Sequence, residues 1–325
     1  MRNIIITGGA GFIGSHLVKY FVKKYTEYNI INVDKLTYAS NIDFLNEICS
    51  FNNYRFVQAD ICNSEKIETI FEKYNISDII HLAAESHVDN SIENALEFAK
   101  TNILGTINLL ELSRKNWVSK KNNLFYHIST DEVFGTLDES GIFNENTKYD
   151  PHSPYSASKA SADHFVKAFY DTHKLPIIIS NCSNNYGPNQ HNEKLIPTVI
   201  NSLINKTKIP VYGNGLNIRD WLYVEDHVEA IDLIFHNGTV GETYCIGGEN
   251  EIRNIDLIKL IIKEFDYIKQ NNNSSIDLIS YVNDRLGHDY RYAIDISKIK
   301  NELGWEPKTN IDKGLRNTLN WYLND

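Results

Sequence analysis

The chain has 325 residues, of which 42% are hydrophobic and 23% charged, and its formal net charge is -10. This composition excludes collagen-like, disordered and disulfide-scaffold proteins, and the length predicts about two domains. Because the acidic excess argues against a duplex binder, we expect no nucleic-acid partner. No apolar run approaches the ~18 residues of a membrane helix, and the four cysteines are far apart with no C-x-x-C pair. We therefore expect a cytoplasmic protein with no membrane partner, no disulfide framework and no metal site.

The first half of the chain alternates short β-branched runs with longer amphipathic runs. Such alternation predicts parallel strands joined by right-handed helical crossovers, and the continuous apolar character of the strands suits a sheet covered on both faces. We therefore expect the α/β class, with a doubly wound, Rossmann-type parallel sheet. The predicted strands are Asn3–Thr7, Ile30–Val33, Tyr54–Gln58, Asp78–Leu82, Leu124–Ile128 and Ile177–Ser180, and the predicted helices cover residues 12–25, 64–74, 92–116 and 155–173.

Beyond residue 180 short strands mix with helices, which predicts a smaller α/β lobe packed against the sheet. We place the first domain at residues 1–180 and the lobe at residues 181–325. Residues 221–246 leave two alternatives, because this segment either stays in the lobe or rejoins the first domain. The predicted strands of this half are Ile209–Tyr212, Thr243–Ile246 and Ile276–Tyr281, and the predicted helices cover residues 193–205, 225–236, 255–265 and 311–323.

Three glycines, Gly8, Gly11 and Gly14, follow the first predicted strand and open the first helix. Glycines in this context permit a tight turn and let the backbone approach a pyrophosphate, which the helix N-terminus attracts. Asp34 lies 20 residues beyond Gly14, at the end of the second strand. A carboxylate there can accept ribose hydroxyls and would repel a 2′-phosphate, whereas the adjacent Lys35 weakens that preference. The sequence therefore predicts NAD as the cofactor and residues 1–180 as the NAD-binding domain.

A Y-x-x-x-K pattern, formed by Tyr155 and Lys159, stands at the start of a predicted helix. At this spacing both side chains share one helix face, and a nearby ammonium stabilises a phenolate, which makes the tyrosine a better base. Ser129 and Thr130 close the preceding strand, where a hydroxyl can bind the substrate oxygen whose proton Tyr155 removes. An isolated motif of this kind is equally typical of a surface pair. The glycine turn upstream favours a redox centre.

Two carboxyl groups, Asp131 and Glu132, follow Thr130 directly beside this redox centre. Two acids so placed can divide the work of an elimination, because one removes a carbon-bound proton while the other protonates the departing hydroxide. A plain dehydrogenase or a 4-epimerase needs neither group. The alternative is that both acids cap the loop before Val133.

The glycine turn, the strand-end Ser129-Thr130 and the Y-x-x-x-K motif resemble the extended short-chain dehydrogenase/reductase superfamily, and the acid pair resembles its nucleotide-sugar 4,6-dehydratases. The resemblance runs through nearly the whole chain. It implies a lyase that converts dTDP-glucose to dTDP-4-keto-6-deoxy-glucose and water with bound NAD, by C4 oxidation, C5/C6 water elimination and C6 reduction, in deoxysugar biosynthesis. The alternatives are a dehydratase or 4-epimerase acting on a UDP- or CDP-hexose, and a catalytically silent NAD-sensing protein.

The same resemblance implies roles for individual residues. Tyr155 would be the oxidation base with Lys159 as its partner, Asp131 the acid and Glu132 the C5 base, while Thr130 holds the sugar. Helices near 92–116 and 155–173 would pair across a two-fold axis into a homodimer, and residues 181–325 would bind the nucleotide sugar. Implied cofactor contacts are Phe12, Ile13, Asp34, Lys35, Thr37, Asp60, Ile61, Ala83, Thr101 and Asn185, and implied substrate contacts are Ser86, Asn184, Lys194, Leu195, Arg219, Asn254, Arg285 and His288.

Three positions depart from the pattern of that family. Phe134 replaces a tyrosine, and Asn90 and Asn181 stand where arginines are typical. None of these departures removes a group with an implied catalytic role. They bear on the nucleotide base and on the details of the pocket.

Overall fold

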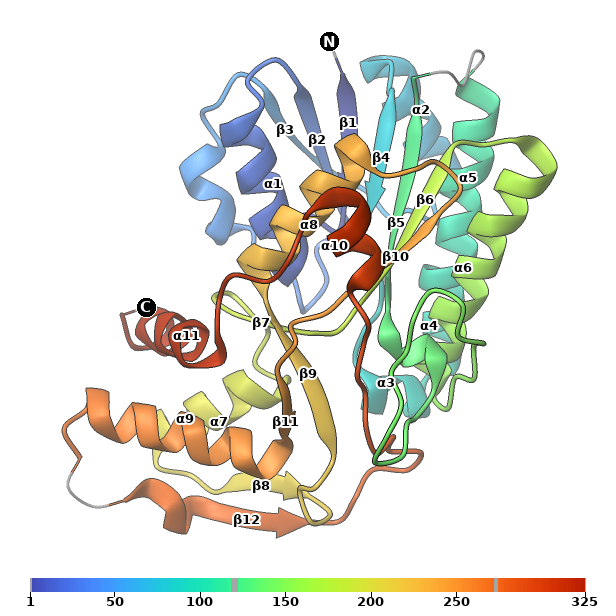
Figure 1. The fold of residues 1–325 in the computed structure, drawn as a ribbon. Helices are drawn as coiled ribbons and strands as arrows, with labels where there is room; N and C mark the ends of the chain where they lie inside the picture. The colour runs from blue at the N-terminus through green and yellow to red at the C-terminus, as the bar shows by residue number, and fades with distance from the viewer. Residues whose placement is uncertain (1, 118–121, 272–273, 325) are drawn as a thin grey trace.

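A parallel sheet of seven strands forms the centre of the larger of two packed units (Figure 1). The computed structural model describes residues 2–117, 122–271 and 274–324. The strands lie in the order β10-β6-β5-β4-β1-β2-β3, and every neighbouring pair is parallel, which confirms the doubly wound α/β fold. Their bounds are β1 (Asn3–Thr7), β2 (Asn29–Asp34), β3 (Tyr54–Gln58), β4 (Asp78–His81), β5 (Leu124–Thr130), β6 (Ile177–Cys182) and β10 (Thr243–Ile246).

Helices cover both faces of this sheet. On one face Phe21 of α1 and Ile231 of α8 share a core with the strands, and on the other face Ile67 of α2, Leu109 of α5 and Val166 of α6 form a second core. Strands buried on both sides explain the continuous apolar runs in the sequence. The helices of this unit are α1 (Phe12–Lys24), α2 (Ser64–Tyr74), α3 (Val88–Glu93), α4 (Ala95–Phe98), α5 (Gly105–Asn116), α6 (Pro154–His173), α8 (Val224–Asn237) and α10 (Ser297–Leu303).

The helix expected over residues 92–116 is divided in the structure. It consists of α4, a π-helical segment η2 (Ala99–Leu104) and α5, and α3 ends before it at Glu93. Within η2 the amide of Asn102 accepts a hydrogen bond from the backbone N–H of Glu85 and donates one to the backbone carbonyl of the same residue. The local widening of the helix therefore accompanies a tertiary contact, which periodicity alone does not reveal.

The second unit lies below the sheet in Figure 1. It has its own apolar core, to which three helices contribute side chains. It contains a three-stranded sheet of order β11-β9-β7 and a parallel pair of β12 and β8. The strand expected at Ile276–Tyr281 begins later, because the Asp266 carboxylate binds Ser275 and holds residues 275–278 in a 3₁₀ turn. The bounds are β7 (Asn184–Tyr186), β8 (Ile209–Tyr212), β9 (Ile218–Tyr223), β11 (Glu251–Arg253), β12 (Ile279–Val282), α7 (Leu195–Asn205), α9 (Asn254–Ile268) and α11 (Ile311–Asn324).

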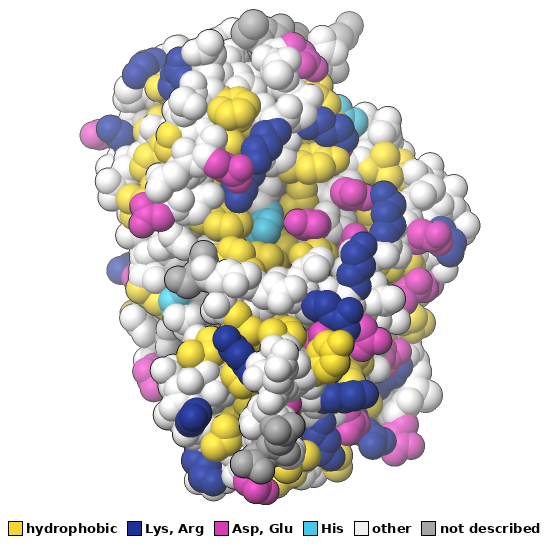
Figure 2. All heavy atoms as spheres, turned by 90° about the vertical axis from the view of Figure 1, so that its left-hand side faces the viewer, with side chains coloured by type: hydrophobic (Ala, Val, Ile, Leu, Met, Phe, Trp, Pro, Cys, Tyr) yellow, Lys and Arg dark blue, Asp and Glu magenta, His cyan; other side chains and the backbone are white. Residues whose placement is uncertain are grey.

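The segment with α8 and β10 lies on the large sheet although it follows strands of the second unit. The division into an NAD-binding domain of residues 1–180 and a lobe of residues 181–325 remains a prediction. No helix in the described ranges is both long and apolar enough to cross a bilayer. On the face that carries α1 and α11, basic and acidic side chains are interspersed (Figure 2), and ion pairs such as Lys23–Glu47 and Arg316–Glu264 join them.

The strand order reverses between β1 and β4, because β2 and β3 continue from β1 to one side while β4, β5 and β6 continue to the other. Ligands of doubly wound sheets bind at the carboxyl ends of the strands at such a point. Gly8 after β1 has a φ of +69°, and a Cβ atom there would lie 2.8 Å from the backbone of Ala83 after β4. Only glycine fits this close approach, which positions the turn over the sheet edge.

Candidate active site

A cleft of about 1520 Å³, counting its solvent-open mouth, follows the carboxyl ends of the large sheet and reaches the second unit. It brings together all five residues with predicted catalytic roles. It also brings together every predicted cofactor residue except Asp60, whose carboxylate accepts a hydrogen bond from the Cys62 N–H in its own turn. The predicted residues that line the cleft are Gly8, Gly11, Phe12, Ile13, Gly14, Asp34, Lys35, Thr37, Ile61, Ala83, Ser86, Thr101, Thr130, Asp131, Glu132, Tyr155, Lys159, Asn184, Asn185 and Lys194.

The glycine turn forms a cradle at the N-terminus of α1. A Cβ atom on Gly14 would lie 2.1 Å from the carbonyl oxygen of Gly8, so no larger residue fits there. Gly11 is the N-cap of α1 and supplies no capping side chain, and the first turn contains no acidic residue. The N–H groups at this helix end are therefore available to an anion, which the helix dipole also favours.

Asp34 stands at the end of β2 and shapes the adjacent loop. Its carboxylate accepts hydrogen bonds from the backbone N–H groups of Ala10 (3.0 Å) and Leu36 (2.8 Å) and from the Ser40 hydroxyl (3.0 Å). A carboxylate has about four acceptor positions, so one remains for a ribose hydroxyl. The neighbouring Lys35 forms ion pairs with Glu85 at 3.2 Å and Glu97 at 3.6 Å, which occupies the cation that a 2′-phosphate would need.

Tyr155 and Lys159 are placed by the start of α6. Ser153 and Ser156 form a reciprocal capping box around Pro154, which fixes where the helix begins. Both Tyr155 and Lys159 are buried at the inner end of the cleft. Burial raises the pKa of Tyr155 well above its usual value, and the charge of Glu132 raises it further.

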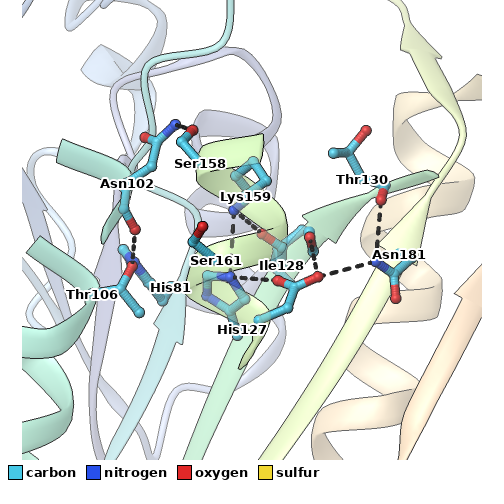
Figure 3. A network of polar contacts seen from close by, with 12 residues as sticks. His81, Asn102, Thr106, His127, Ile128, Thr130, Ser158, Lys159, Ser161 and Asn181 are labelled. Atoms are coloured by element: carbon cyan, nitrogen blue, oxygen red, sulfur yellow. Dashed lines mark hydrogen bonds and ion pairs between the residues drawn. The ribbon is translucent and has the colours of Figure 1, made fainter. Parts of the chain in front are cut away.

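The Lys159 ammonium points toward strand β5. Its Nζ atom donates to the backbone carbonyl of Ile128 at 2.8 Å and lies 3.5 Å from Nε2 of His127 (Figure 3). Burial lowers the pKa of Lys159, and the carboxylate of Asp163 opposes this effect. The stabilisation of a Tyr155 phenolate by Lys159 stays a prediction.

The two acids stand in a single 3₁₀ turn over Asp131–Phe134 that follows β5. The Thr130 hydroxyl accepts from the Glu132 N–H and donates to Oδ1 of Asp131, both at 3.3 Å. Asp131 is 1% exposed, and its Oδ2 is without a hydrogen-bond partner among the described residues. Burial, with Glu132 and Asp220 nearby, raises the pKa of Asp131 well above its usual value. A raised pKa favours the protonated form of Asp131, which is the form that a proton donor requires.

Glu132 has a different electrostatic environment. It is half-buried, and burial raises its pKa, whereas the positive charges of Lys194, Arg219 and Arg285 lower it. The pKa of Glu132 is raised overall, but these three cations oppose the shift and stabilise the ionised form. The environments of Asp131 and Glu132 therefore differ in the way that separate acid and base roles require.

Of the predicted substrate residues of the second unit, Lys194, Arg219 and Arg285 carry positive charges near Glu132, but most members of the group do not line the cleft. Lys194 lines the cleft and donates to the Ser86 carbonyl at 2.8 Å. Arg285 forms a two-point ion pair with Asp89 of α3, with Nε–Oδ1 and Nη2–Oδ2 distances of 2.5 and 3.0 Å. The residues that do not line the cleft are Leu195, Arg219, Asn254, Arg285 and His288.

Comparison with known proteins agrees with this geometry. A profile of the GDP-mannose 4,6 dehydratase family matches residues 5–318. The dTDP-glucose 4,6-dehydratase of Salmonella typhimurium is 50% identical over 334 aligned positions, which cover 98% of this chain and 92% of that protein. The chain belongs to the dTDP-glucose 4,6-dehydratase family. The resemblance seen in the sequence is thereby confirmed.

Solved structures of this family share the fold. The Bacillus anthracis dTDP-glucose 4,6-dehydratase in complex with NAD is 43% identical with a TM-score of 0.90, and the match covers 100% of this chain and 97% of that one. The Streptomyces venezuelae enzyme of the same name, also with NAD bound, is 37% identical with a TM-score of 0.93, over 100% and 98% of the two chains. A UDP-glucose 4-epimerase of Thermotoga maritima, 29% identical with a TM-score of 0.88 over 99% of each chain, has the same architecture.

The cleft of this family member also contains residues that sequence reasoning missed. Glu85 follows β4 and pairs with Lys35, and His191 meets the ring of Tyr38 edge-on across the mouth, with centroids 5.3 Å apart. Glu85 is the first charged residue after the strand, which is a signal that was present in the sequence. Ser129, which the sequence analysis placed at the strand end beside Thr130, also lines the cleft, and the remaining lining residues that were not predicted are Val33, Ala39, Ser40, Ala59, Leu82, Ala84, Ile128, Cys182, Ser183, Gln190 and Glu193.

Proposed function

We propose that the protein is a lyase that converts dTDP-glucose to dTDP-4-keto-6-deoxy-glucose and water in deoxysugar biosynthesis. The observation that carries this proposal is the pair of carboxyl groups, the buried Asp131 and the half-buried Glu132, beside Tyr155 in one cleft. Relatives that are about half identical over nearly the whole chain are named for this reaction. A simple 4-epimerase needs no such acid pair.

NAD is the cofactor in this proposal. The glycines of the turn carry no side chains, so a ligand can approach the backbone closely, and the N-terminus of α1 favours an anion. Asp34 offers its remaining acceptor position to a ribose hydroxyl. When bound, NAD supplies the hydride acceptor for C4 of the sugar and the hydride donor for C6. The nucleotide extracted from purified protein should be NAD or NADH on chromatography. Recovery of NADP as the main species would overturn this assignment.

The residues of the chain then have distinct proton-transfer roles. Tyr155 accepts the proton of the C4 hydroxyl as that carbon is oxidised to a ketone. The ketone makes the C5 proton acidic, so the carboxylate of Glu132 can remove it. Asp131 gives its proton to the C6 hydroxyl, which leaves as water, while Thr130 holds the sugar at the end of β5.

The substrate test compares dTDP-, UDP- and CDP-glucose. We expect the NAD-loaded protein to form the 4-keto-6-deoxy product from dTDP-glucose with the highest kcat/KM, which product NMR identifies. A C4 epimer as the main product would favour the epimerase alternative. Preference for UDP- or CDP-glucose would overturn the dTDP assignment and leave the dehydration chemistry in place.

We further propose that the protein is a homodimer. Leu96 of α4, Leu104 of η2 and Phe165 of α6 are 74%, 58% and 41% exposed, on helices that pack against one another. An apolar surface of this kind on the helices that the family resemblance pairs across a two-fold axis supports an interface there. Light scattering should give twice the monomer mass, and Phe165→Glu should reduce it; a monomeric wild type would overturn the proposal.

A cytoplasmic location stays a prediction, which four free cysteines support.

A further inference from the structure

A buried polar cluster extends from Lys159 away from the cleft, behind the redox centre. Asp163 of α6 stands four residues after Lys159 on the same helix, and His127 of β5 lies between the two side chains. Nε2 of His127 is 3.5 Å from Nζ of Lys159 and 3.1 Å from Oδ1 of Asp163. Figure 3 shows His127 and Lys159 facing each other between strand and helix. All three side chains are buried.

The second oxygen of the same carboxylate has only neutral donors. Oδ2 of Asp163 accepts from the Ser129 hydroxyl at 2.8 Å, from the Tyr149 hydroxyl at 2.9 Å and from the Asn181 amide at 3.4 Å. Donors of this kind favour the ionised carboxylate. Burial raises the pKa of Asp163, but its bonds to His127 and Ser129 and the charge of Lys159 lower it overall.

The charges of the cluster therefore balance. Burial and the charge of Lys159 lower the pKa of His127 to about 4, so the imidazole is neutral at neutral pH. One ammonium, Lys159, and one carboxylate, Asp163, remain with the neutral ring of His127 between them. A buried ammonium without a counter-ion gives up its proton, because desolvation disfavours its charged form.

We propose that Asp163 and His127 are positioning residues of the redox centre: Asp163 is the buried counter-ion that keeps Lys159 charged behind Tyr155, and the neutral ring of His127 lies between the two charged groups. This inference rests on the proposed function for its effect on turnover. Neither residue lines the cleft, so each acts through Lys159. A purely structural alternative is that Asp163 only fastens β5 to α6 through its hydrogen bonds.

Other titratable groups surround the cluster and set the background of any pH profile. They face Lys159, Tyr155 or Asp163 from the neighbouring elements, and all of them stay unchanged in the Asp163 and Lys159 variants below. They are His81 from β4, Cys182 from β6, Tyr149 from the segment before α6, and Asp131 and Glu132 from the turn after β5.

The first experiment measures the pH dependence of kcat for the NAD-loaded enzyme with dTDP-glucose. Asp163→Asn keeps the shape of the side chain and removes its charge, so Lys159 loses its proton more easily and stabilises a Tyr155 phenolate less. We expect the acid limb of the profile to move upward by about 1–3 pH units, the usual effect of one nearby charge. The control is Tyr149→Phe, which deletes one neutral hydrogen bond to the same oxygen and should leave the limb in place.

The second experiment needs no activity and therefore separates this inference from the proposed function. Thermal unfolding is compared for Asp163→Asn, Lys159→Met and the double variant. Each single change leaves one buried charge without its partner, whereas the double change removes both, so its loss in Tm should be smaller than the sum of the single losses.

Additive losses in Tm, or an unchanged acid limb in Asp163→Asn, would overturn the counter-ion role and leave Asp163 as a structural fastening. If Asp163→Asn alone does not fold, the double variant decides. Recovery of folded protein on removal of Lys159 supports the proposal, and failure to recover contradicts it.

Discussion

Replacement of Asp131 by Asn should slow the enzyme and stabilise it. Because burial raises the pKa of Asp131, the folded chain keeps a proton on this carboxyl to a higher pH than the unfolded chain, which releases it above about pH 3.9. The contribution of this carboxyl to stability is therefore complete below that pH and is lost as the pH rises toward the raised pKa of the folded state. The loss amounts to about 1.4 kcal/mol per pH unit. Asn avoids this loss because it has no proton to release.

Urea unfolding from about pH 4 to about pH 8 measures this effect, with NAD held constant. The stability advantage of Asp131→Asn over wild type should increase with pH, whereas Glu139→Gln, which removes an exposed acid of the same segment, should show no such trend. The variant should also lose about 10²–10⁴ in kcat, because it cannot protonate the leaving hydroxyl. An advantage that is constant or falls with pH would refute the protonated state of Asp131.

Three further changes test the remaining site residues. Tyr155→Phe should lower kcat by about 10²–10⁴ with folding intact, as measured by steady-state assay and circular dichroism, and normal turnover would contradict its role as base. Glu132→Gln should suppress solvent deuterium uptake at C5, followed by NMR in D₂O; exchange at the wild-type rate would exclude Glu132 as the C5 base. Asp89→Asn frees Arg285 from its ion pair and should lower KM by about 2–5-fold with kcat unchanged, the worth of one partly exposed pair. A higher KM would show that Asp89 supports the bound state.

The large sheet could be predicted from the sequence because its strands, four to seven residues long, contain short apolar runs and alternate with longer amphipathic segments. Strand β9 could not, because its buried Arg219 and Asp220 look like solvent-exposed charges in the sequence. Asp220 is buried only because the backbone N–H groups of Gly248 and Asn250 bind it from a distant segment. A polar residue whose partner lies about 30 positions away leaves no periodic signal.

The site shows the same limit at the level of single residues. The glycine turn, Asp131 and Tyr155 lie in one cleft because the first two follow strands of the same sheet and Tyr155 stands at the start of α6, which packs against that sheet. The role of Asp163 was open to detection, because it extends the Y-x-x-x-K spacing by one more helical turn. His127 was not, because a histidine inside an apolar strand is indistinguishable from an ordinary core residue until α6 packs against it.

The basic residues in and beside the cleft explain how an acidic chain can keep a site for an anionic substrate without a loss of stability. An unpaired buried charge costs several kcal/mol, and Lys159 and Arg285 each have a carboxylate of the chain as partner. The two partners differ in the ease with which a ligand can replace them. Asp89 is half-exposed on the six-residue helix α3, so a phosphate can compete with it for Arg285. Asp163 is buried, accepts from three neutral donors and does not line the cleft, so it is not exposed to a ligand there.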